Sequence, residues 1–253
     1  MSRLNIIIND DYQYLAGWIA TVPRLFAEGR GQSLYRGRNE VRLLEISGMR
    51  VVAKRFKRHD VVKRCIYTFM RPSKARRAYE NALALRERGY QTPAAIAYIE
   101  ERMMGLVTQV YYLCAYTDAQ PIRPRLIEQE AFDVSLATSY ARYVAAMHQA
   151  GVLHRDLNPT NVLFREHGGV FDFELIDINR MRFYDGPVPK DECMENLTLF
   201  YWLTPAYRFI LDEYARQRGW TQDDVAQAIR VKQRHDRNWV RRKRLTHPFS
   251  YKK

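Results

Sequence analysis

The chain has 253 residues, 47% hydrophobic and 13% aromatic, which suits one two-lobed globular unit or two small domains and excludes a disordered chain. Its three cysteines form no C-x-x-C pair, so neither a disulfide framework nor a cysteine zinc site is predicted, and reduced thiols fit the cytosol. We expect no signal peptide and no membrane span, because the first apolar run, residues 6–8, is short and no run approaches ~18–20 apolar residues.

The formal net charge of +13 is concentrated in two segments of the chain. Residues 55–77 carry nine lysines and arginines against one aspartate, and residues 230–253 carry ten against one. The remainder holds 22 bases and 26 acids, a net charge of −4. Two basic patches on a mildly acidic body predict a polyanionic partner, which can be a membrane surface, an anionic glycolipid or a nucleic acid. The alternative is a solvated face and a frayed basic tail.

Residues 1–30 are amphipathic and aromatic, and we predict a short leader that packs on the first lobe. Glycine-containing turns then separate three predicted strands, at residues 32–36, 41–46 and 50–56.

The third of these strands carries the first candidate site residue. Val51-Val52-Ala53-Lys54 resembles the V-A-I-K strand of protein kinases, which predicts that Lys54 contacts the α- and β-phosphates of a nucleotide. The turn before the second strand contains Gly37 alone, so the G-x-G-x-x-G loop is absent. Gly37 either belongs to a turn that covers the phosphates or is an ordinary hairpin glycine.

A capped helix is predicted for residues 74–88, with an apolar stripe at helical spacing. Glu80 lies near that stripe, and in a kinase this helix carries the glutamate that pairs with the strand lysine, so Glu80 is predicted to hold Lys54. Glu87 is the second candidate. The alternative is that Glu80 forms a surface ion pair with a basic neighbour on the helix, Arg76 or Lys74.

Residues 92–99 and 106–113 are predicted to form two further strands. Together with the earlier three they give a five-stranded antiparallel sheet with one main helix, which is the pattern of a kinase amino-terminal lobe. Residues 114–117 would then form the hinge to the second lobe.

A long amphipathic helix at residues 127–150 leads into the strongest motif, His154 to Asn161, which reads H-R-D-L-x-x-x-N. Phosphoryl transfer needs a carboxylate to accept the proton of the attacking hydroxyl, and Asp156 has that place. Asn161 and Asp177 are predicted to hold Mg²⁺, because amide and carboxylate oxygens suit a hard cation whose other ligands are phosphates. The alternative is a polar loop in an unrelated α/β domain. His148, on the long helix, is expected to be packed or solvated and not catalytic.

Short predicted strands at residues 161–164 and 173–176 flank a glycine turn and should bring Asn161 and Asp177 close together. Three helices are predicted after Asp177, near residues 191–203, 205–218 and 221–244. No A-P-E motif follows Asp177, and a protein kinase uses that region as a platform for peptides. The sequence therefore favours a small or carbohydrate-like acceptor.

From about Gly31 to Arg182 the chain resembles the protein-kinase-like lipopolysaccharide core kinases, which phosphorylate Kdo or heptose sugars of the inner core. The resemblance is carried by the segments Arg36–Glu40, Val52–Phe56, Glu80–Leu83, Gly89–Pro93, His154–Leu163 and Ile176–Arg180. It implies a single α+β, protein-kinase-like domain with a leader (1–30), an amino-terminal lobe (31–116) and a small, mostly helical carboxy-terminal lobe (117–253).

The resemblance also implies the chemistry: ATP and Mg²⁺ as cofactors and an inner-core sugar as acceptor, with Kdo on lipid A favoured over heptose. Asn179 stands where protein kinases have the glycine of D-F-G, as is common in this group. Asn158 stands where many protein kinases have a lysine, so a cation is missing, and Arg180 is the first candidate to replace it.

The acceptor implied by the resemblance is a lipid-anchored sugar at the inner leaflet of a Gram-negative bacterium, so the protein is expected to be cytoplasmic and peripheral on the inner face of the inner membrane. The two basic patches would then face anionic lipid. Each base near such a leaflet contributes about 1 kcal/mol, so half a dozen give roughly 6 kcal/mol, or about four decades of partitioning. Trp239, Phe249 and Tyr251 among the carboxy-terminal bases also favour an interface.

Two alternative functions stay open. The first is a compact protein kinase, against which the apparent lack of an activation segment argues. The second is a non-catalytic pseudokinase or a basic nucleic-acid-binding module. Nucleic acid is not the expected partner, because the bases lie outside any recognised nucleic-acid motif and every predicted metal-site residue is present.

Overall fold

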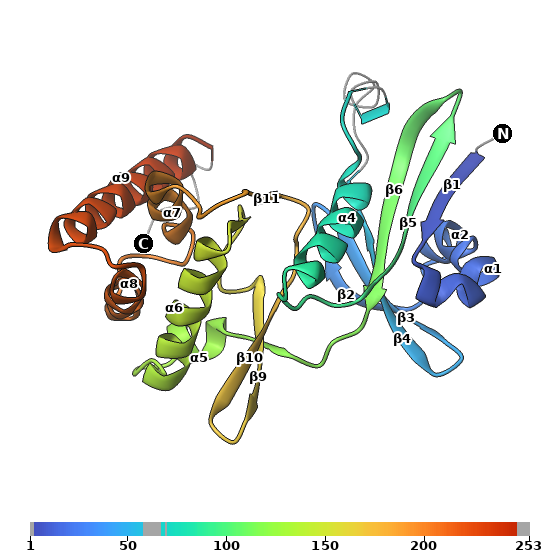
Figure 1. Cartoon of the computed structure of the whole chain (residues 1–253). Coiled ribbons are helices and arrows are strands. Elements are labelled where there is room, and N and C mark those ends of the chain that lie inside the picture. Colours follow the sequence, from blue (N-terminus) through green and yellow to red (C-terminus); the bar gives the residue numbers. More distant parts are fainter. Residues whose placement is uncertain (1–2, 58–66, 69, 247–253) are drawn as a thin grey trace. The chain divides into compact units, whose positions relative to one another are not determined.

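The computed structural model describes residues 3–57, 67–68 and 70–246, with the backbone alone for residues 244–246. These residues form two compact units (Figure 1). The first unit comprises Met1–Asp118 together with Asp177–Arg180, and the second comprises Ala119–Ile176 and Met181–Lys253. The predicted α+β fold class is confirmed.

The first unit is built on a six-stranded antiparallel sheet, with strand order β1-β5-β6-β4-β3-β2. The strands are β1 (Arg3–Ile8), β2 (Gln32–Arg36), β3 (Glu40–Ile46), β4 (Met49–Arg55), β5 (Ala95–Met103) and β6 (Leu106–Ala115). The prediction of five strands was therefore wrong by one. The additional strand is β1, which lies in the predicted leader.

The strand β1 forms because its side chains alternate between the core and solvent. Leu4, Ile6 and Ile8 pack against the core of the first unit, and Ile6 lies opposite Ile99 of β5. A short apolar run without a following turn signal does not reveal an edge strand, because its partner is distant in the sequence.

The two faces of this sheet are covered by different helices (Figure 1). On one face lie η1 (Asp10–Leu15), α1 (Ala16–Ile19) and α2 (Val22–Ala27). Their buried side chains share a core with Ala97 and Ile99 of β5. Tyr98 lies between these two residues, so its ring points to the opposite face, where it meets Tyr79 of α4 (Lys74–Glu87) with ring centroids 5.5 Å apart.

The helix α4 begins after Ser73, whose Oγ accepts a hydrogen bond from the backbone N–H of Arg76, as an N-cap side chain does. Its end at Glu87 agrees with the prediction to within one residue. The buried stripe along the helix consists of Ala75, Ala78, Tyr79, Ala82 and Leu85.

The second unit is mostly helical. Its helices are α5 (Arg123–Ile127), α6 (Val134–Gln149), α7 (Lys190–Leu197), α8 (Pro205–Arg218) and α9 (Gln222–Thr246). Its strands are β7 (Gln120–Pro121), β8 (Val152–His154), β9 (Val162–His167), β10 (Val170–Leu175) and β11 (Met181–Phe183). The three predicted carboxy-terminal helices are confirmed, although α7 ends at Leu197 and not near residue 203.

The helix predicted for residues 127–150 is shorter than expected. It begins at Val134, because Asp133 caps it: Oδ1 of Asp133 accepts a hydrogen bond from the N–H of Leu136 at 2.9 Å. Within the described ranges, none of the helices combines the length and the apolar character needed to cross a bilayer.

Candidate active site

In the first unit, the strand lysine and the predicted metal-binding aspartate lie in direct contact. Nζ of Lys54, on β4, donates to Oδ1 of Asp177 at 2.5 Å, and the two side chains are 17% and 30% exposed. Nδ2 of Asn179 donates to the same oxygen at 2.7 Å. Asp177 has a φ of +55°, a left-handed conformation that is uncommon outside glycine and that clusters at functional sites.

The segment Asp177–Arg180 is held in the first unit by α4. Nδ2 of Asn81 donates to the backbone oxygen of Ile178 at 2.7 Å, and the Ile178 side chain is buried. Asn81 is therefore the residue through which α4 fixes the backbone beside Asp177. No motif in the sequence assigns Asn81 a role at the site.

The predicted pair between Lys54 and Glu80 is wrong. Glu80 instead accepts a hydrogen bond from Nε of Arg76 at 2.7 Å, and both side chains are about half exposed. The reason is that Glu80 lies on the solvent-exposed side of α4, beside the buried stripe. Glu87, seven residues later, is exposed as well. Asn81, one residue on, faces the Asp177 segment.

Several cations gather around Lys74 near Asp177. Burial lowers the pKa of Lys74, and the charges of Arg38, Arg180 and Arg77 lower it further, while Asp177 acts in the opposite direction. Nε of Arg77 is buried and has no hydrogen-bond partner among the described residues. We call Arg38, Lys74, Arg77 and Arg180 the cation cluster. Like charges this close favour binding of an anion.

Two members of the cation cluster, Lys74 and Arg77, lie in the first turn of α4 together with Arg76. This turn contains no acidic residue. Cations there oppose the partial positive charge of a helix N-terminus, so they destabilise the helix unless an anion binds.

Gly37 lies in the turn between β2 and β3, where its N–H donates to the backbone oxygen of Asn39 at 3.0 Å. A Cβ atom at Gly37 would collide with the hydroxyl end of the Tyr35 side chain. The local geometry is that of a hairpin turn, and contact of Gly37 with phosphates stays a prediction. Arg38, the next residue, belongs to the cation cluster.

In the second unit, the catalytic-loop motif is organised around His154, which is 1% exposed. Its Nδ1 accepts a hydrogen bond from the N–H of Asp156 at 3.1 Å, so its Nε2 carries the proton and donates to the backbone oxygen of Ile176 at 2.9 Å. His154 thus connects the loop to the residue directly before Asp177.

The two asparagines after Asp156, Asn158 and Asn161, hold that loop. Nδ2 of Asn158 donates to Oδ1 of Asp156 at 3.3 Å, and Nδ2 of Asn161 donates to the backbone oxygen of Asp156 at 2.9 Å. The backbone oxygen of Asn161 accepts from the N–H of Ile176 at 3.0 Å. With its amide nitrogen bonded in this way, the other polar atom of the Asn161 side chain is an oxygen, the kind of atom that a magnesium ligand requires.

A buried polar network supports the loop from behind. Nδ2 of Asn196, on α7, donates to the backbone oxygen of His154 at 2.8 Å, and Oδ1 of Asn196 lies 3.1 Å from Nε2 of His148. Nδ1 of His148 lies 2.8 Å from the hydroxyl of Tyr214. Burial lowers the pKa of His148 to about 3, so the imidazole is neutral at pH 7. His148 is packed, as expected, but it also braces the loop through Asn196.

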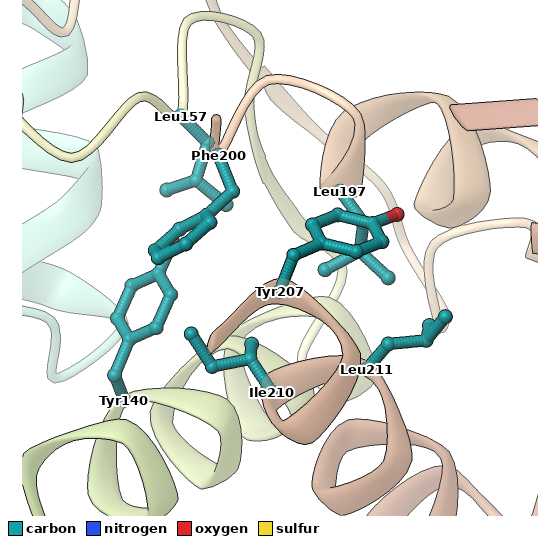
Figure 2. Close-up of a pocket in the computed structure, with 7 residues that line it drawn as sticks. All are labelled: Tyr140, Leu157, Leu197, Phe200, Tyr207, Ile210 and Leu211. Atoms are coloured by element: carbon teal, nitrogen blue, oxygen red, sulfur yellow. The ribbon is translucent and has the colours of Figure 1, made fainter. Parts of the chain in front are cut away.

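The pocket in Figure 2 lies beneath Leu157 of the same loop. Its walls are the apolar side chains of Tyr140, Leu157, Leu197, Phe200, Tyr207, Ile210 and Leu211. The void is only about 10 Å³, the space of roughly one water molecule. The Leu157 side chain is therefore held in place by packing against side chains of α6, α7 and α8.

The predicted magnesium ligands suit a metal that is shared with phosphates. Among the described residues, no group of three or more His, Cys, Asp or Glu side chains could hold an ion by itself. Asp177 offers a carboxylate and Asn161 an amide oxygen, and Mg²⁺ is commonly held by one or two such ligands together with the phosphates of a nucleotide. Each of these two side chains, taken by itself, therefore fits a Mg²⁺ whose remaining ligands are phosphates.

The predicted basic patches are only partly free surface. In the carboxy-terminal patch, Lys232 is 1% exposed and its Nζ donates to Asp236 at 2.7 Å, while Trp239 packs on Trp202 with ring centroids 4.9 Å apart. Phe249 and Tyr251 lie outside the described residues. In the patch at 55–77, residues 58–66 and 69 also lie outside the described ranges.

A lysine paired with an aspartate after a β-hairpin, together with an H-R-D-L-x-x-x-N loop fixed by its own histidine, defines a phosphotransferase of the protein-kinase type.

The comparison with protein families is more specific. The model of the lipopolysaccharide kinase (Kdo/WaaP) family matches residues 51–231, and the chain therefore belongs to this family. The resemblance expected from the motifs is thus confirmed.

One solved structure agrees on the fold over most of the chain. A structure described as WaaP in complex with acyl carrier protein is 20% identical, with a TM-score of 0.61, and the match covers 92% of this chain and 98% of that chain. The kinase domain of Mycobacterium tuberculosis PknI, a double mutant, is 19% identical, with a TM-score of 0.39 over 58% of this chain and 56% of that chain. No match was found among the curated proteins.

Proposed function

We propose that the protein is an ATP-dependent kinase that transfers the γ-phosphate to a hydroxyl of an inner-core lipopolysaccharide sugar, with Kdo on lipid A as the favoured acceptor. Membership of the lipopolysaccharide kinase (Kdo/WaaP) family supports the reaction class. The observation that carries the proposal is the contact between Lys54 and Asp177, residues 123 positions apart in the chain.

Each site residue has a defined part in this reaction. Bound Mg²⁺ would be held by Asp177 and Asn161, and it supplies charge neutralisation at the phosphates. Lys54 binds the α- and β-phosphates. Asp156 accepts the proton of the acceptor hydroxyl as the new oxygen–phosphorus bond forms and the bond between the γ-phosphorus and ADP breaks. Asn158 orients the carboxylate of Asp156 through the bond at 3.3 Å.

The cation cluster compensates for two missing kinase features, the glycine-rich loop and the catalytic-loop lysine. Arg180 was the expected replacement for that lysine, and the mutual effect of Arg180, Arg38 and Arg77 on the pKa of Lys74 supports a shared anion site. Fixed cations aimed at developing phosphate charge are among the largest contributions to phosphoryl transfer. The ligand proposed for the cluster is the triphosphate.

The acceptor determines where the protein acts. A sugar attached to lipid A is presented at a membrane surface, so we propose a cytoplasmic protein bound peripherally to the inner face of the inner membrane. The surplus of bases over acids supports attraction to an anionic leaflet. The exposed bases of the segments 55–77 and 230–253 would contribute to it, and Lys232 would not, because it is buried.

The test is ATP turnover with purified Kdo–lipid A, compared with a core acceptor that ends in heptose. The wild-type protein should consume ATP faster with the Kdo acceptor, and Asp156→Ala should abolish phosphorylation of the sugar while unfolding at the same temperature as the wild type. Equal turnover by Asp156→Ala would remove Asp156 from the mechanism. Turnover with the heptose acceptor alone would reassign the substrate within the family.

A further inference from the structure

The turn between β5 and β6 combines backbone strain with an exposed apolar side chain. Met104 has a φ of +52° and Gly105 a φ of +80°, the pattern of a two-residue hairpin turn in which Asn-Gly is the favoured sequence. A bulky side chain is disfavoured in this left-handed conformation. The Met104 side chain is nevertheless 93% exposed, and Met103 beside it is 46% exposed. Neither folding nor packing explains a methionine here.

A third exposed methionine belongs to the same end of the first unit. Oγ1 of Thr68 accepts a hydrogen bond from the N–H of Val107 at 2.9 Å, which ties the chain just before Met70 to the start of β6. Met70 is 78% exposed. Methionine side chains are flexible and polarizable, so they adapt to a partner that has no fixed shape.

The charged residues around these methionines are arginines. Arg71 follows Met70 and is exposed. Arg3 of β1 lies directly opposite Arg102 of β5. Like charges directly opposite each other normally destabilise a sheet. Glu100 accepts a hydrogen bond from Arg102 at 3.0 Å, so the charge of Arg102 is offset within the unit, and Glu101 accepts from Tyr111 at 2.8 Å.

From these contacts we infer that this end of the first unit docks on an anionic lipid bilayer. We call Met70, Arg71, Met103 and Met104, with Arg3, the methionine tip. The three methionines enter the boundary between headgroups and acyl chains, and the arginines meet lipid phosphates. A bilayer fits both features, because it accepts apolar side chains of any shape and its anionic lipids attract the exposed Arg3 and Arg71.

This inference rests on the proposed function for its purpose, since the tip would hold the enzyme on the surface that presents its acceptor. Lipid binding itself needs neither ATP nor an intact catalytic loop. The two can therefore be measured separately, with vesicle sedimentation for the tip and turnover of a water-soluble, deacylated acceptor for the kinase.

The decisive variant is Met104→Asn, which replaces the strained methionine by the residue that the turn prefers. Partitioning onto phosphatidylcholine vesicles containing about one fifth phosphatidylglycerol should fall about tenfold, while the unfolding temperature should rise. Opposite signs in the two readouts distinguish a lipid contact from a structural role. Arg71→Gln should weaken binding about fivefold on these vesicles and leave binding to pure phosphatidylcholine unchanged.

The matched control is Val170→Asn, in the second unit, where an exposed apolar side chain (65%) also lies beside a hairpin turn. This variant should bind vesicles as the wild type does. If Met104→Asn partitions onto vesicles as strongly as the wild type does, the inference is overturned. A change in the oligomeric state of this variant, without a change in partitioning, would instead show that the tip contacts a second copy of the chain. If Met104→Asn weakens vesicle binding but the wild type phosphorylates no soluble or lipid-bound sugar, the tip stands and the proposed function fails.

Discussion

Removing the carboxylate of Glu80 should leave catalysis almost unchanged, in contrast to the corresponding glutamate of protein kinases. Glu80 bonds Arg76 on the surface, with the two side chains 47% and 49% exposed, and Lys54 bonds Asp177. A solvent-exposed pair one helical turn apart contributes about 0.3–0.5 kcal/mol. Glu80→Gln should therefore lower the unfolding temperature by only about 1–2 °C and change kcat/KM by less than about twofold.

The comparison that gives this result its meaning is Lys54→Met. Loss of one fixed cation from a phosphoryl-transfer site typically costs about 100- to 1,000-fold in rate. Steady-state turnover at saturating acceptor should therefore separate the two variants by at least two decades, with circular dichroism as the control for folding. A loss of about 100-fold in Glu80→Gln would show that α4 turns Glu80 toward Lys54 during catalysis, and the assignment of its outward face would be refuted.

Three further outcomes follow from the second unit. Asn196→Leu removes the hydrogen bonds of Asn196 with His148 and with the backbone oxygen of His154, so it should cost about 2–4 kcal/mol in urea unfolding and lower kcat; an unchanged midpoint would contradict the bracing role. The pKa of His148 is lowered to about 3 in the folded state, so the neutral imidazole stabilises the fold above pH 6.5. That stability is lost as the pH falls from 6.5 toward 3, with a slope of up to about 1.4 kcal/mol per pH unit. His148→Gln should flatten the dependence of stability on pH, and an unchanged slope in this variant would contradict the assignment. Gly151→Ala should destabilise the protein by about 1–3 kcal/mol in thermal unfolding, because Gly151 has a φ of +73° and a Cβ would lie 2.5 Å from two backbone oxygens; wild-type stability would show that the turn relaxes freely.

Much of the fold could be predicted because its signals are local. Alternating apolar residues between glycine turns predicted five of the six strands of the first unit, and the spacing of apolar residues predicted α4 and the carboxy-terminal helices. The edge strand β1 was missed because its partner, β5, is about ninety residues away in the sequence. The start of α6 was missed because Asp133 was not recognised as its cap.

The site was predictable where a motif fixes the chemistry and unpredictable where packing decides. The motifs identified Lys54 and Asp177, which lie in contact. They did not decide which face of α4 turns toward Asp177, because Glu80 and Asn81 are neighbours in sequence and both lie beside the apolar stripe.

The positions of several bases and of the buried polar contacts could not be predicted from the sequence either. Lys74 and Arg77 were counted with the membrane-facing charge, and the structure places Lys74 near Asp177 and Arg77 near Arg180. Lys232 was counted in the same way and is buried. The bond between Asn196 and His154 joins residues 42 positions apart, and no local pattern announces such a contact.

The most direct test of the central claim is to follow the γ-phosphate itself. Purified protein, Mg²⁺ and ATP labelled at the γ-position are incubated with Kdo–lipid A, and the sugar product is analysed by mass spectrometry. The account predicts one labelled phosphate on the sugar with the wild type and none with Asp156→Ala or Asp177→Asn. A folded wild-type protein that binds Mg²⁺ and ATP but leaves both the Kdo and the heptose acceptors unphosphorylated would contradict it.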